Sequence, residues 1–84
     1  MDTATLDRAL VLADAEGSVR DAAATLRAAC APLRVVVVDA LDMRGETPAA
    51  VGSRRLLYLG ASDGHCWSVT ADLAQAAGLF IADR

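Results

Sequence analysis

The chain has 84 residues, of which 55% are hydrophobic and 23% are charged. This apolar composition excludes a mainly disordered chain, and the length allows one domain, residues 1–84. Eight basic residues, all of them arginine, stand against 11 acidic ones, so the net charge of −3 repels polyanions and disfavours nucleic-acid binding.

The first residues and the apolar runs predict a soluble, cytoplasmic chain with no membrane partner. Asp2 and Arg8 interrupt the first turns, where a secretory signal would be apolar. No apolar run, Val35–Val38 included, approaches the about 20 residues that span a bilayer. In a reducing compartment Cys30 and Cys66 stay free thiols, and two cysteines with one histidine are too few for a closed zinc site. We therefore expect neither a metal nor a cofactor.

The first third of the chain predicts two helices. Apolar residues recur at helical spacing over residues 3–15, and Gly17 ends that pattern. Ser18, followed three residues later by Asp21, is close to a capping box and predicts a second helix over residues 18–30.

A β-branched run follows the predicted helices. Residues 33–41 predict a strand, and Val35–Val38 would be apolar on both of its faces, as is typical of a central strand. Residues 42–53 contain two glycines and a proline without a clear period, which predicts a long loop.

A β-hairpin is predicted around Asp63-Gly64, a pair typical of two-residue turns. The flanking strands would cover residues 54–61 and 65–70, with Gly60 opposite Trp67. An indole that lies across a glycine covers its bare backbone, which gives Trp67 a structural role.

The last predicted element is a helix over residues 71–77, capped by Thr70 and ended by Gly78. The order is then α-α-β-β-β-α. We expect an α+β fold, a small two-layer domain with a mainly antiparallel three-stranded sheet packed by helices.

Polar residues near the hairpin and the long loop could form a ligand site or an active site. Asp63 could orient His65, and Arg44, Arg54 and Arg55 could hold an anion. The turn and the interleaved acidic residues give simpler explanations for both groups. Adjacent strand residues point to opposite faces, so His65 and Cys66 make a poor catalytic dyad. We predict no catalytic residue.

Residues 13–26 are similar to the first helices of bacterial LysR-type regulators. The resemblance covers about a sixth of the chain and implies a helix-turn-helix-like regulator that binds nucleic acid through helices 3–15 and 18–30. In that family a polar recognition helix follows, whereas Pro32 and four valines follow here.

The predicted sheet carries more apolar surface than three short helices can cover. A bare face would be a contact surface, with Tyr58, Trp67 and Val69 as its predicted residues. The leading hypothesis is a non-catalytic module that homodimerises or binds a protein partner. The alternatives are the nucleic-acid-binding regulator and a small ligand-binding protein or enzyme, and no motif specifies a substrate.

Overall fold

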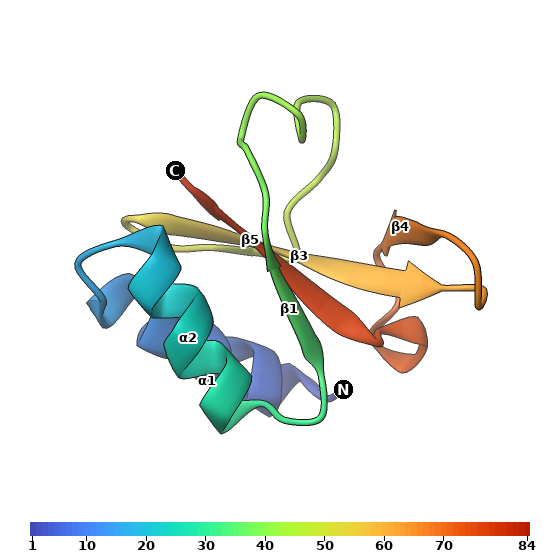
Figure 1. The fold of residues 1–84 in the computed structure, drawn as a ribbon, viewed down its shortest axis with the longest axis horizontal. Helices are drawn as coiled ribbons and strands as arrows, with labels where there is room; N and C mark the ends of the chain where they lie inside the picture. Colours follow the sequence, from blue (N-terminus) through green and yellow to red (C-terminus); the bar gives the residue numbers. More distant parts are fainter.

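Two helices and a five-stranded sheet make up the fold in the computed structural model, which describes residues 1–84 (Figure 1). The elements are α1 (Thr3–Ala15), α2 (Val19–Ala29), β1 (Arg34–Val37), β2 (Ala50–Val51), β3 (Arg55–Ser62), β4 (Trp67–Thr70), a 3₁₀ turn (Leu73–Gln75) and β5 (Gly78–Asp83). The α+β class is confirmed. The sheet has five strands instead of the expected three.

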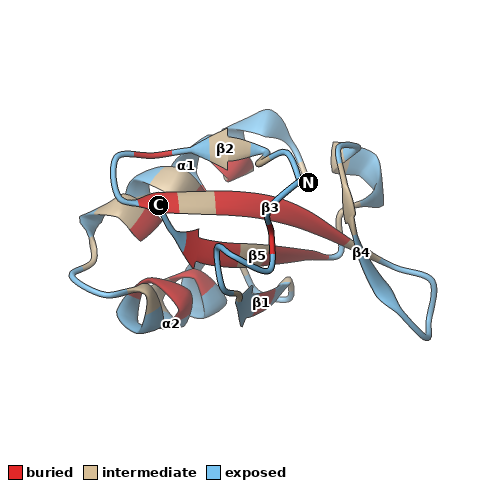
Figure 2. Ribbon diagram, turned by 90° about the horizontal axis from the view of Figure 1, so that it is seen from above, coloured by how far each residue is buried: buried red, intermediate tan, exposed pale blue.

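The sheet is mixed and is built around two central strands. Its order is β1-β5-β3-β2, and β4 pairs with the far end of β3. The β1–β5 pair is parallel, whereas β3 pairs antiparallel with β2, β4 and β5. Figure 2 shows the greatest burial along β3 and β5.

The two helices form where their caps predict them, and both pack on one face of the sheet (Figure 1). The Asp2 carboxylate accepts the Thr5 N–H at 2.8 Å, and the Ser18 hydroxyl accepts the Asp21 N–H at 3.1 Å. The largest fully buried side chains lie between helices and sheet: Leu26, Leu57, Leu59, Leu79 and Ile81. Neither helix has the length and apolar run needed to cross a membrane.

The predicted C-terminal helix is wrong. Residues 71–77 form only the 3₁₀ turn Leu73–Gln75, which Asp72 caps by accepting the Ala74 N–H at 2.9 Å. The Ala77 N–H then donates to the Gly60 carbonyl at 2.8 Å, and β5 continues beside β3. A helix of seven residues is marginal by itself, so strand pairing prevails over alanine's helix propensity.

The valine run is predicted to form a central strand, and this position is wrong. β1 is an edge strand, not a central one, because β5 pairs with it on one side only. Val35 is buried against the helices, whereas Val36 and Val37 remain exposed. The expected loop over residues 42–53 contains β2, which pairs with the start of β3.

The hairpin forms, but its register is shifted by two residues from the prediction. Trp67 pairs with Ser62 and Val69 pairs with Gly60, because Asp63 begins a longer connection. The Asp63 carboxylate accepts the N–H groups of His65 at 2.9 Å and of Cys66 at 2.8 Å. Gly64 has a φ of 97° in this connection, a conformation that other residues rarely adopt.

Asp14, near the end of α1, anchors the helix layer to the sheet. Its carboxylate accepts the backbone N–H groups of Ser53 at 2.7 Å, Arg54 at 3.1 Å and Arg55 at 3.0 Å. Partial burial raises the pKa of Asp14, but the three hydrogen bonds together lower it by more. The pKa therefore lies below the ordinary value of 3.8. A β-carbon at Gly52 would strike this carboxylate, which explains the glycine there.

We predict that Asp14→Ala lowers the free energy of unfolding by about 1–3 kcal/mol at neutral pH, because three backbone donors lose their acceptor. The folded state binds the Asp14 proton less tightly than the unfolded state does, so this stabilisation is present above pH 3.8 and is lost as the pH falls through the folded pKa. Urea titrations from neutral to acid pH should therefore show a shallower pH dependence in the variant. Asp7→Ala, on the exposed side of α1, is the control, and equal effects of the two changes would contradict the role of Asp14.

Candidate functional site

The face of the sheet opposite the helices has no helix over it and is here called the helix-free face. Its apolar residues are Val36, Val38, Val51, Leu56, Tyr58, Trp67, Val69, Phe80 and Ala82. The loop between β1 and β2 rises on this side (Figure 1), and Met43 from the loop packs with Tyr58 and Ala82. The loop covers only part of the face, since Val36 remains 40% exposed.

The indole of Trp67 packs over two glycines, Gly60 and Gly78. A β-carbon built on Gly60 would come within 3.2 Å of the indole, and one built on Gly78 within 3.1 Å. The ring therefore rests on bare backbone of β3 and β5. It also meets Phe80 edge to face, with ring centroids 6.2 Å apart and an interplanar angle of 67°. Even so, Trp67 is 42% exposed.

The residues proposed for an interface lie on this face, but they differ in access. Tyr58 is only 3% exposed beneath the loop, and Val69 is half-buried. Trp67 is the member whose side chain reaches solvent most. Val36 and Phe80 are not predicted from the sequence, because β5 brings Phe80 beside Trp67 and Val36 beside Phe80.

The Asp63 carboxylate of the hairpin connection accepts hydrogen bonds from the backbone N–H groups of His65 and Cys66. Hydrogen bonds from the backbone N–H groups of Cys66 and His65 lower the pKa of the Asp63 carboxyl. That carboxylate therefore orders its own turn. His65 and Cys66 are both exposed in the same connection, and Cys30 is a half-buried free thiol whose pKa burial raises.

The loop arginines do not join the hairpin residues. Arg54 and Arg55 lie at the start of β3 and Asp63 just beyond its end, and at the usual strand rise about 26 Å separate Arg55 from Asp63. Arg55 is only 4% exposed, and its guanidinium already donates a hydrogen bond to the Glu16 carbonyl at 2.9 Å. Arg44 is exposed in the loop between β1 and β2.

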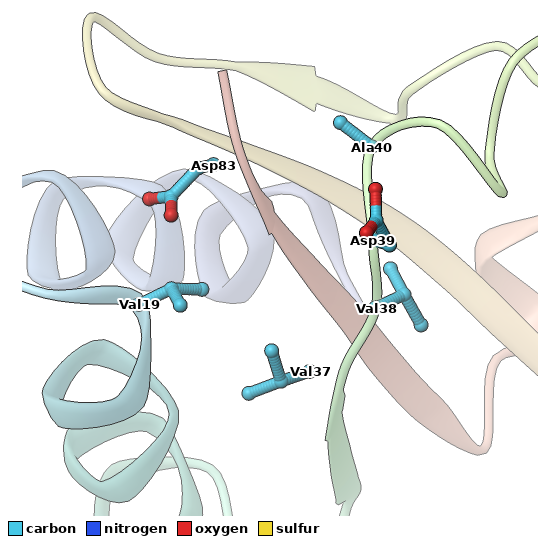
Figure 3. A pocket seen from close by; sticks show the side chains of 6 residues that line it. All are labelled: Val19, Val37, Val38, Asp39, Ala40 and Asp83. Atoms are coloured by element: carbon cyan, nitrogen blue, oxygen red, sulfur yellow. The ribbon is translucent and has the colours of Figure 1, made fainter.

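One open cavity of about 380 Å³ lies at the carboxyl ends of the parallel strands β1 and β5, beside the start of α2 (Figure 3). Its lining consists of Val19, Val37, Val38, Asp39, Ala40 and Asp83.

Both carboxylates in this cavity already have partners. Asp83 pairs with Arg55 at 3.3 Å, and Asp39 accepts the Leu41 N–H at 2.8 Å. Figure 3 shows that the carboxyl groups of Asp83, at the end of β5, and of Asp39, in the loop after β1, do not point at each other. The lining contains no nucleophile and no paired acid and base.

Neither metal-ligand geometry nor similarity to other proteins adds a function. No three His, Cys, Asp or Glu side chains lie close enough together to hold a metal ion. No protein-family model, curated protein or solved structure matches the chain. The exposed part of the helix-free face is therefore the best candidate site.

We predict that Trp67→Ala lowers the free energy of unfolding by only about 1–2 kcal/mol, because much of the indole is already in solvent. Tyr58→Ala, on the same face but buried, should cost about 3–5 kcal/mol. Urea denaturation followed by circular dichroism measures both. A Trp67→Ala cost as large as that of Tyr58→Ala would place the indole in the core and remove it as a contact residue.

Proposed function

We propose that the protein is a small non-catalytic interaction module that binds a protein partner through the helix-free face. The observation that carries this proposal is the half-exposed indole of Trp67, held on Gly60 and Gly78 beside Phe80, with the exposed Val36 on the same face. Exposed aromatic and β-branched side chains grouped on one face are typical of protein contact surfaces.

The contacts that hold the Trp67 ring in place favour binding. Tryptophan is among the residues most enriched at the energetic centres of protein interfaces, since its ring buries a large apolar area. Here contacts with Phe80 and the two glycines orient the ring before any partner arrives. A side chain already ordered loses little conformational entropy on binding, so more of the burial energy contributes to affinity.

The alternative of nucleic-acid binding has less support. The net charge of −3 opposes a polyanion, and Arg27 of α2 already donates two hydrogen bonds to the Val35 carbonyl, at 3.2 and 3.0 Å. The apolar sides of α1 and α2 pack against the sheet, and the α2 end leads directly into β1.

The alternative of an enzyme or ligand-binding protein lacks a site that gathers its predicted residues. Asp63 lies at the opposite end of β3 from Arg54 and Arg55, and the carboxylates of the cavity have partners. A binding module explains the exposed indole of Trp67 without requiring a reaction.

Photo-crosslinking tests the proposal directly. A photoreactive amino acid placed at Val36 lies on the helix-free face beside Phe80, and one placed at Val11 lies on the exposed side of α1, with a native exposure of 69%. In the cells that produce the protein, we expect a discrete protein adduct from position 36 and none of the same mass from position 11.

Trp67→Ala in the position-36 chain should remove at least most of that adduct, whereas Leu41→Ala, an exposed change in the loop, should leave it. The mass of the adduct tells a second copy from a different protein, and the loss expected with Trp67→Ala applies to the adduct with a different protein. Equal adducts from positions 36 and 11, or an adduct with a different protein that survives Trp67→Ala, would refute binding through the helix-free face.

A further inference from the structure

The outer edge of β1 carries backbone groups that nothing in the fold pairs. In the parallel pair, Arg34 N–H donates to the Ala77 carbonyl and Val38 N–H to the Ile81 carbonyl, at 3.4 and 2.9 Å. Even-numbered residues of this strand therefore face β5 with their backbone groups. The backbone groups of Val35 and Val37 point outward, since neighbouring residues alternate along a strand.

Arg27 meets one of these outward groups. Its Nε and one terminal nitrogen donate to the Val35 carbonyl at 3.2 and 3.0 Å. No hydrogen bond within the chain uses the Val35 N–H or either backbone group of Val37. A free, β-branched strand edge is a template for another strand, and a charged side chain on it limits such pairing.

We propose that the outer edge of β1 pairs antiparallel with β1 of a second copy, about a two-fold axis at Val36, and that Arg27 limits the strength of this pairing. In this register Val35 of each copy lies opposite Val37 of the other, and the four outward residues exchange N–H and carbonyl hydrogen bonds in two pairs. The pairing is self-complementary, as a two-fold contact requires.

The charge at the start of the strand suits this orientation. β1 begins at Arg34, whose side chain lies on the helix-free face beside Gly78. A parallel pair would place Arg34 directly opposite Arg34 of the second copy, whereas the antiparallel register places it opposite Val38. Avoidance of like charges therefore favours the antiparallel, two-fold arrangement.

Pairing at β1 goes beyond the proposed function and requires no other protein. Opposite residues of an antiparallel pair share a face, so the dimer would join the two helix-free faces side by side. The effect of this joining on partner binding rests on the proposed function.

Sedimentation velocity of the purified full-length chain over a wide concentration range tests the pairing. We expect a concentration-dependent dimer, and we expect Arg27→Ala to lower its dissociation constant about tenfold, because the competing hydrogen bonds to the Val35 carbonyl are lost. Arg20→Ala removes the same charge from the exposed side of α2 and should leave the dissociation constant unchanged. Identical behaviour of the Arg27→Ala and Arg20→Ala chains would overturn the role of Arg27.

Amide hydrogen exchange identifies the surface without relying on a variant. The Val35 and Val37 amides should become protected as the dimer forms, and Val37→Pro should abolish dimerisation, since that N–H serves no bond in the monomer. A dimer that leaves both amides unprotected would overturn the β1 proposal, and so would a Val37→Pro chain that is folded and still dimeric. A chain that stays monomeric even with Arg27→Ala would also overturn it.

Trp67→Ala separates this proposal from the proposed function. The change should leave the β1 dimer intact, because the indole lies away from that edge, over β3 and β5. Loss of the dimer in Trp67→Ala, with unprotected Val35 and Val37 amides, would place self-association on the helix-free face instead.

Discussion

Two short helices can cover only one face of this five-stranded sheet, and the rest of the structure depends on that constraint. The covered face carries the large aliphatic residues of β3 and β5 and forms the core: Leu57, Leu59, Leu79 and Ile81. The opposite face must be covered by the loop between β1 and β2, which brings Met43 over Tyr58. The loop does not extend over Trp67, so the indole is left half-exposed on its two glycines. A small domain thus acquires a contact surface from a shortage of covering elements.

The predictable parts of the fold are those specified by neighbouring residues. Helical spacing and the Ser18 cap predict α1 and α2 closely, because capping and amphipathic periodicity act within a few turns. The hairpin is predicted, but its register depends on how the Asp63 side chain satisfies the next backbone groups. β5 is missed because its partners, β1 and β3, are distant in the chain. Without β5, the sequence also gives no indication that the valine run lies at an edge of the sheet, and its apolar residues resemble a central strand.

For the candidate site, the sequence indicates the right face through Trp67 but not its extent. The alternation of β3 and β4 places Tyr58 and Trp67 together even with the register off by two, since a two-residue shift preserves the side of the sheet. Which of them is exposed depends on the loop that carries Met43, and no local pattern predicts where a loop rests. Phe80 joins the site only through β5. The arginines, which the sequence grouped by proximity, are separated by their roles: Arg55 is buried in an ion pair, whereas Arg44 is exposed.

The central claim is that the helix-free face is open in the isolated chain and covered in its complex, and Trp67, the single tryptophan, reports on it. Incorporation of 5-fluorotryptophan gives one ¹⁹F resonance, whose shift between H₂O and D₂O measures solvent contact of the ring. The account predicts a clear solvent shift in the dilute purified chain and its loss in the purified complex with a different protein cross-linked from position 36. A ring already shielded in the isolated chain, or an equal solvent shift in the complex, would contradict it.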